Sequence, residues 1–206
     1  TRWSDVPSGS HEGTGGAPLL PSKITSLGPL GTLITEQDRA VPRVAFAISF
    51  EIGRVDAAPA VAEVYAAAFW TRAGDVSHRG TTSFLRSIGS NLHASCTMHH
   101  CTISGSTLTL GLTSTIDLVQ RQLEREVFVV RGLHYTKEDV AEAWTTRPDS
   151  AVVVHRAIMA ALPASHAYAQ HHTLTARQVD GITPAQLEEF HGRLRRAPRT
   201  IAFAGA

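Results

Sequence analysis

Residues 43–53 read RVAFAISFEIG, and this stretch decides the fold. Apolar side chains occur at every second position from Val44 to Ile52, which is typical of a strand with one buried face. Gly53 ends the strand, and Pro59 then stands where a helix can begin, since proline is tolerated in the first helical turn. A half-buried strand followed by a helix predicts a sheet with helices packed against one face.

The region after Pro59 continues this mixture of helices and strands. Apolar residues at helical spacing predict a helix that Gly74 ends, and a shorter helix is predicted over residues 77–88. Residues 92–112 are rich in Thr, Ile and Leu, which favours two strands, with a turn predicted at residues 104–106. Another short strand is predicted over residues 31–35.

Capping boxes predict three helix starts in the C-terminal half. In this motif a hydroxyl bonds a backbone amide, and an acid or amide side chain three residues on bonds back. The pairs are Ser114 with Asp117, Thr136 with Asp139, and Thr183 with Gln186. Pro148 separates two predicted helices, residues 137–146 and 148–162, and residues 200–204 form the last predicted strand. The predicted fold class is α+β, a largely antiparallel sheet with helices packed on one face.

The composition is that of an ordinary globular domain. The chain has 206 residues, of which 43% are hydrophobic and 18% charged, and its formal net charge is +1. A charge near zero gives no reason to expect nucleic acid as a partner, and no apolar run is long enough for a membrane. Glycine, serine and proline in residues 1–22 predict a flexible tail, which leaves residues 23–206 as a single domain.

The two cysteines, Cys96 and Cys101, are too few for a disulfide framework, so a reducing compartment is expected. If they shared one extended stretch, their side chains would point to opposite faces. Among 19 Lys and Arg residues only Lys23 and Lys137 are lysine, a bias that indicates a bacterial genome rich in G and C. Together these features predict a bacterial cytoplasmic protein.

Six segments resemble, in order and spacing, one domain of the pitrilysin/insulinase family of zinc metallopeptidases. Residues 162–169 are similar to the family's F-P-x-x-H-P-Y segment, with Ala167 in place of the second proline, and residues 182–190 are similar to its I-T-x-x-D-L-x-x-F helix start. The remaining similar segments are residues 27–32, 43–53, 87–95 and 201–206. The resemblance implies the predicted α+β fold.

Active members of that family carry the zinc-binding motif H-x-x-E-H on the first helix. Its two histidines bind zinc and its glutamate activates the metal-bound water. Counting from Gly74, the residues at these three positions are Tyr65, Ala68 and Phe69. A later glutamate completes the family's zinc site, but Thr145 and Thr146 stand near its expected place, with Glu142 as the nearest carboxylate. We therefore expect no catalytic residue, no metal and no cofactor in this chain.

What the resemblance implies is a non-catalytic subunit of a two-chain zinc metallopeptidase that helps to enclose a peptide. Its partner would be a catalytic pitrilysin-like subunit that carries the zinc. In the family an edge strand takes the peptide as an added strand through backbone hydrogen bonds. The matching residues are Leu92, His93, Ala94, Ser95, Cys96 and Thr97. Coverage of this edge by the partner is an equal alternative.

Several other interpretations stay open at this point. His99 with Cys101, or His166 with His171 and His172, could bind a metal, and Cys96 could act as a nucleophile, although ordinary packing is favoured in each case. The stripe that includes Tyr65 and Phe69 is favoured as core, and it could also line a peptide pocket or a partner surface. The whole chain could instead be a binding scaffold without a protease partner, or an unrelated α+β enzyme.

Overall fold

The computed structural model describes residues 22–38, 40, 42–70, 72–73, 76–125, 132–146, 157–158, 161–163, 165–166, 168–169 and 174–205. The predicted tail, apart from Ser22, lies outside these residues, as do Ala167, His171, His172 and most of the predicted helix over residues 148–162. In the part that the structure describes, no helix has the length and apolar character needed to cross a bilayer.

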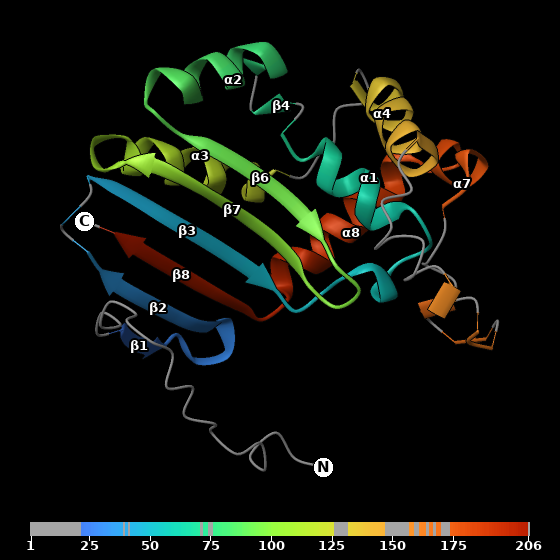
Figure 1. Cartoon of the computed structure of the whole chain (residues 1–206), viewed down its shortest axis with the longest axis horizontal. Coiled ribbons are helices and arrows are strands. Elements are labelled where there is room, and N and C mark those ends of the chain that lie inside the picture. Colours follow the sequence, from blue (N-terminus) through green and yellow to red (C-terminus); the bar gives the residue numbers. More distant parts are fainter. Residues whose placement is uncertain are drawn as a thin grey trace, which may run out of the picture.

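A six-stranded sheet forms the frame of the molecule, in the order β1-β2-β8-β3-β7-β6 (Figure 1). Its strands are β1 (Ser22–Ser26), β2 (Gly31–Gln37), β3 (Arg43–Phe50), β6 (Asn91–Cys96), β7 (Cys101–Leu108) and β8 (Arg199–Gly205). Every neighbouring pair is antiparallel except β2 with β8, which is parallel. A separate two-stranded sheet pairs β4 (Arg72–Ala73) with β5 (Val76–Ser77).

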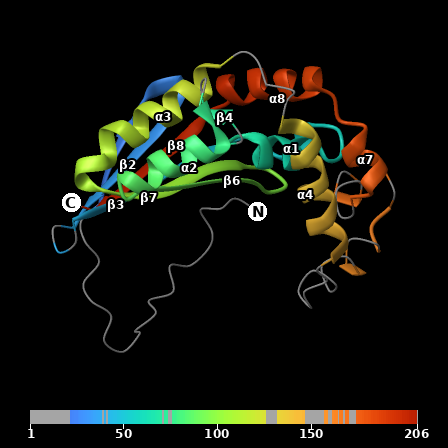
Figure 2. The same ribbon diagram turned by 90° about the horizontal axis from the view of Figure 1, so that it is seen from above.

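Helices α3 and α8 lie along one face of the six-stranded sheet, and α4 and α7 stand at one end of it (Figure 2). The helices are α1 (Val61–Ala68), α2 (His78–Ser87), α3 (Leu112–Glu124), α4 (Leu133–Thr146), α7 (Ala176–Asp180) and α8 (Pro184–Arg196). This arrangement confirms the predicted α+β class, with a largely antiparallel sheet and helices on one face.

The core lies between the sheet and the helices. The alternation in β3 buries Val44, Phe46, Ile48 and Phe50 on the helix face. Residues directly opposite them on β8 continue the same apolar face, with Phe46 across from Phe203 and Ile48 across from Ile201. On the helix side, α8 contributes Leu187, Phe190 and Leu194 to this cluster. Apart from Arg43 at its start, the residues of β3 that face the other way are small, namely Ala45, Ala47 and Ser49.

The predicted turn at residues 104–106 is wrong. β6 and β7 are joined by a tight turn over residues 97–100, and residues 104–106 lie inside β7. Gly105 is needed there because β6 passes close to it: a Cβ at Gly105 would lie 2.2 Å from the carbonyl oxygen of Asn91. The glycine thus marks a close strand contact, which composition alone cannot distinguish from a turn.

Only one of the three predicted capping boxes exists. At Thr183, the backbone N–H donates to Gln186 Oε1 at 2.8 Å, while the Thr183 hydroxyl accepts from the Gln186 N–H and caps the helix. Ser114 and Thr136 lie inside α3 and α4, which begin earlier than predicted, and the Thr136 hydroxyl donates to the carbonyl of Gly132. A capping box at Thr175 and Gln178, which starts α7, was not predicted.

Candidate functional site

The three residues at the expected zinc-motif positions on α1 are all buried. Tyr65 is 2% exposed, Ala68 6% and Phe69 3%. The Tyr65 ring packs edge-on against Phe190 of α8, with 5.1 Å between ring centroids, and against Phe69 at 5.7 Å. These side chains are core residues, so the interpretation that Tyr65 and Phe69 line a peptide pocket or a partner surface is wrong for this chain.

Tyr65 is held by a buried hydrogen bond to His191 of α8. The distance between the Tyr65 hydroxyl and His191 Nδ1 is 2.8 Å, and His191 Nε2 lies 3.0 Å from the carbonyl oxygen of Leu123. Because a carbonyl only accepts, Nε2 carries the proton and Nδ1 accepts from the tyrosine. Burial lowers the pKa of His191 and raises the pKa of Tyr65, so both groups are neutral at ordinary pH. This neutral pair is therefore a structural contact between α1 and α8.

The rest of the expected zinc site contains no ligand set either. Glu142 lies on an exposed face of α4, and Thr145 and Thr146 form the end of the same helix. Among the described residues, no group of three His, Cys, Asp or Glu side chains is placed to hold a metal ion.

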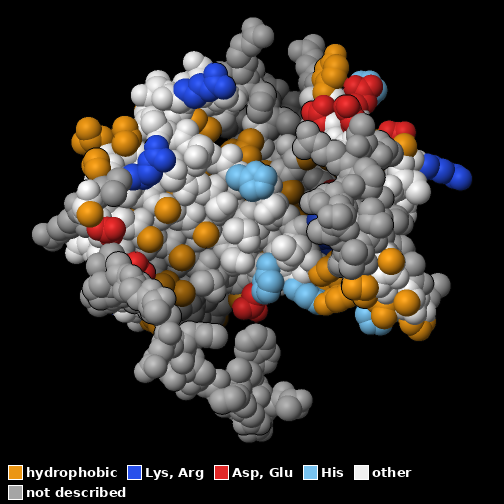
Figure 3. Space-filling view, in the orientation of Figure 1, with side chains coloured by type: hydrophobic (Ala, Val, Ile, Leu, Met, Phe, Trp, Pro, Cys, Tyr) orange, Lys and Arg blue, Asp and Glu red, His pale blue; other side chains and the backbone are white. Residues whose placement is uncertain are grey.

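β6 forms an edge of the sheet, where the resemblance placed the peptide-binding strand. The strand ends at Cys96, so Thr97 belongs to the turn. The side chains of Leu92, Ala94 and Cys96 face the helices, while His93 and Ser95 are exposed on the opposite face. That opposite face carries few charged side chains across the middle of the sheet (Figure 3).

The hydrogen-bond alternation of β6 shows which of its backbone groups point away from β7. The Thr97 N–H donates to the His100 carbonyl at 2.7 Å, which makes these two residues a hydrogen-bonded pair. In an antiparallel ladder such pairs alternate with pairs whose N–H and C=O groups point away from each other. The residues of β6 with outward-pointing backbone groups are therefore Leu92, Ala94 and Cys96.

A disulfide joins Cys96 to Cys101 across the end of the β6–β7 hairpin. The expectation that these cysteines point to opposite faces is wrong, because the turn makes them directly opposed residues on neighbouring strands. Their sulfur atoms cannot serve as a nucleophile or as ligands in this state, which removes the Cys96 nucleophile and the His99–Cys101 metal site. Disulfides are rare in reducing compartments. The cytoplasmic location stays a prediction.

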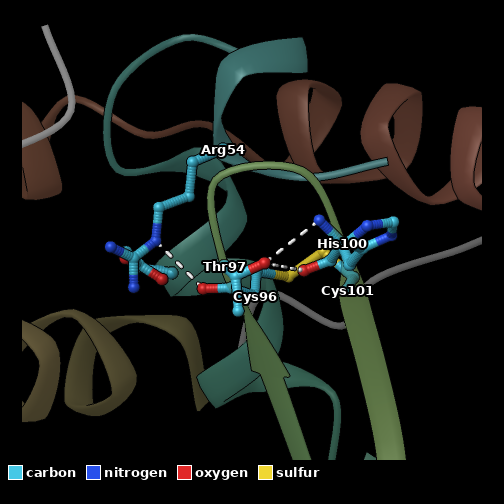
Figure 4. Close-up of polar contacts among 6 residues, drawn as sticks. Arg54, Cys96, Thr97, His100 and Cys101 are labelled. Atoms are coloured by element: carbon cyan, nitrogen blue, oxygen red, sulfur yellow. Dashed lines mark hydrogen bonds and ion pairs between the residues drawn. A yellow bond between two sulfur atoms is a disulfide. The ribbon is translucent and has the colours of Figure 1, made fainter. Parts of the chain in front are cut away.

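Arg54 links the hairpin to α1, a role that the sequence did not suggest (Figure 4). Its backbone N–H donates to the Thr97 carbonyl at 3.0 Å, and its Nε donates to the Cys96 carbonyl at 3.0 Å. Its guanidinium also forms an ion pair with Glu63 of α1 and lies over the ring of Trp144, 5.6 Å from the centroid. Burial raises the pKa of Glu63 to about 7, although the Arg54 charge acts to lower it.

Gly53 is the residue in the sequence that could have indicated this contact between Arg54 and the β6–β7 hairpin. A Cβ at Gly53 would lie 2.5 Å from the Met98 carbonyl oxygen, so only glycine lets the chain cross the hairpin turn and place Arg54 beside β6.

The tip of the hairpin makes a further contact through Tyr168. His99 hydrogen-bonds the Tyr168 hydroxyl, and His166 Nδ1 accepts from the Tyr168 N–H at 3.2 Å. The two histidines thus contact one tyrosine, without a third ligand for a metal among the described residues.

Comparison with solved structures gives the same fold. An inactive domain of an M16 peptidase from Pseudomonas fluorescens matches with a TM-score of 0.78 and 18% sequence identity, over 90% of this chain and 47% of that one. A protease from Helicobacter pylori matches with a TM-score of 0.76 and 10% identity, over 91% of this chain and 46% of that one. The fold is that of an M16 peptidase domain. No protein-family model and no curated protein matches the sequence.

A third similar structure belongs to a longer chain. The periplasmic protease PqqL from Escherichia coli matches with a TM-score of 0.75 and 14% identity, over 89% of this chain but only 22% of PqqL. The M16-like domain described here spans about half the length of the first two similar structures. At these identities the similarity establishes the fold, while activity and partners need separate arguments.

Proposed function

We propose that this chain is a non-catalytic subunit of a two-chain zinc metallopeptidase and that it helps to enclose and bind the peptide substrate. The observation that carries the proposal is the state of α1, where Tyr65, Ala68 and Phe69 fill the zinc-motif positions as buried core residues. Buried tyrosine, alanine and phenylalanine side chains at these positions cannot bind zinc or activate water. The partner is then a pitrilysin-like subunit that holds the zinc.

Peptide binding is assigned to β6. An exposed strand edge can pair with an extended peptide through backbone groups, whatever the peptide's sequence. The outward-pointing groups of Leu92 and Ala94 supply such an edge, and His93 and Ser95 beside them are exposed. Affinity without strong sequence selection suits a subunit that binds leader peptides or small peptides while the catalytic partner cleaves them.

The similar structures contain more than this fold. The chain covers 47% of the inactive M16 peptidase domain and 46% of the Helicobacter pylori protease, so each of those chains has a further region of comparable size, and the partner in this proposal corresponds to that region. The strongest of these matches is to a domain described as inactive, which agrees with the loss of the zinc motif here.

Co-expression tests this proposal directly. The chain is produced together with the H-x-x-E-H protein encoded nearest to it in the same genome, and the products are separated by size-exclusion chromatography and assayed for zinc and peptidase activity. We expect one joint peak that contains zinc and cleaves peptides, and no activity from either chain alone. Zinc binding and cleavage by this chain alone would contradict the proposal, and separate elution with a fully active partner would leave a binding scaffold.

A further inference from the structure

One end of the β6 edge differs from the rest because Arg54 occupies it. Of the outward-pointing carbonyls of β6, that of Cys96 already accepts a hydrogen bond from Arg54 Nε at 3.0 Å. In Figure 4, Arg54 lies on the side of β6 away from β7, which is the side where a peptide would add. At this end the edge therefore offers donors, namely the Cys96 N–H and the guanidinium, and no free carbonyl.

The guanidinium retains donor capacity. Arginine has five N–H donors, and the contacts of Arg54 with Cys96 and Glu63 both use Nε. Within the part of the chain that the structure describes, neither Nη atom has a recorded hydrogen bond, and the side chain is 26% exposed. The guanidinium carbon of Arg54 also lies over the Trp144 ring, 5.6 Å from its centroid, and this cation–π contact helps to hold the side chain in place.

We propose that this end of β6 binds the C-terminal carboxylate of an extended peptide that runs parallel to β6. The inference rests on the proposed function, since it adds a recognised terminus to the same peptide-binding edge. A carboxylate only accepts hydrogen bonds and carries a negative charge, so it complements a cluster of donors around an arginine.

The register of a parallel strand fits this placement. In a parallel pair, a peptide residue opposite His93 donates to the Leu92 carbonyl and accepts from the Ala94 N–H. A residue two positions further on donates to the Ala94 carbonyl, and its own carbonyl group meets the Cys96 N–H. If that residue is the last of the peptide, its carboxylate lies between the Cys96 N–H and Arg54. No further pairing is available, because Arg54 already occupies the Cys96 carbonyl.

The opposite peptide direction is disfavoured by charge. An antiparallel peptide that ended here would bring its ammonium group to this end of β6. The N–H donors of the ammonium group would face the Cys96 N–H and the Arg54 guanidinium, and the positive charge of Arg54 would repel it. Within the described residues, Glu63 is the carboxylate that pairs with Arg54, and burial raises its pKa to about 7, so it is partly protonated at neutral pH. The guanidinium therefore keeps charge available for a bound carboxylate.

The test compares two forms of one probe, an N-terminally fluorescein-labelled hexapeptide of alternating threonine and valine, with a free or an amidated C-terminus. Binding to the full chain is measured by fluorescence polarisation at pH 7. We expect the free acid to bind at least about 10-fold more tightly than the amide, as for a charge-assisted contact. Arg54→Gln is expected to bind both forms equally, and Arg54→Lys to keep part of the preference, because it retains the charge but lacks the guanidinium fork.

Arg43→Gln is the matched control, since Arg43 is an exposed arginine on β3 that has no contact with β6, and it is expected to keep the full preference. Equal binding of acid and amide by the wild-type chain would overturn the inference and leave the proposed function intact, whatever the stability of the variants. Binding of neither form would contradict both. A dimer in size-exclusion chromatography that excludes the peptide would assign the edge to a second copy and would also overturn the inference.

Discussion

Ala94→Pro should remove peptide binding while leaving the fold intact. The backbone N–H of Ala94 points away from β7, so proline at this position removes a donor from the free edge and no bond from the β6–β7 ladder. The proline ring also stands where the added strand would lie, which should cost a second hydrogen bond. Two bonds at a net value of about 0.5–1.5 kcal/mol each correspond to a loss of roughly 5- to 150-fold in affinity.

Ser95→Pro is the matched control because it has the opposite orientation. Ser95 lies opposite Thr102 in a hydrogen-bonded pair, so this substitution breaks the ladder and should lower the melting temperature measured by circular dichroism. Both variants are titrated with the labelled hexapeptide by fluorescence polarisation. An Ala94→Pro variant that melts like the wild type and binds the peptide with unchanged affinity would refute the assignment of the outward edge.

Three further outcomes follow from the buried contacts. Tyr65→Phe removes the buried hydrogen bond between the Tyr65 hydroxyl and His191 Nδ1 and should lower the free energy of unfolding in urea by about 1–3 kcal/mol, whereas a loss near zero would show that the pair contributes nothing. Glu63 has a pKa of about 7 in the folded chain against 4.5 ordinarily, so the folded state holds the extra proton between these values; its contribution to stability is complete below pH 4.5 and is lost as the pH rises through 7. Urea titrations across that range should show this decline, and Glu63→Gln should not show it. Gly105→Ala should strongly destabilise the chain because its Cβ would meet the Asn91 carbonyl oxygen at 2.2 Å, while Gly192→Ala, with no atom nearer than 3.9 Å, should stabilise α8 by about 0.5–1 kcal/mol in the same assay.

The sequence revealed those parts of the fold that depend on local pattern. The alternation in residues 43–53 predicted β3, the pair Thr183 and Gln186 predicted the start of α8, and both are present. The fold class followed from the order of the predicted strands and helices, while the edge position of β6 came from the resemblance, and both agree with the structure. β1 was not predicted, since Ser22–Ser26 has no buried face and is a strand only because β2 pairs with it.

Long-range contacts account for most of what the sequence did not reveal. Gly105 was interpreted as part of a turn because its contact with Asn91 on the neighbouring strand cannot be seen in the local sequence. With the turn misplaced, Cys96 and Cys101 were assigned to one strand, and their disulfide was not predicted. Arg54 looked like any other loop arginine, and its role depends on carbonyls of the hairpin that no local pattern connects to it. Tyr65 was identified as a lost zinc ligand, but its partner His191 lies on α8, far away in the sequence.

The position of β8 has a consequence for synthesis. β8 separates β2 from β3 and pairs with both, although it follows them at the far end of the chain. Until the ribosome has made Arg199–Gly205, β3 lacks one neighbour and the apolar face of Phe46 and Ile48 is only partly covered. At about 5–20 residues per second, the nascent chain waits roughly 10–30 s between these two strands. During that interval β3 and β2 are unprotected strand edges, and the growing chain offers a chaperone a specific segment to shield.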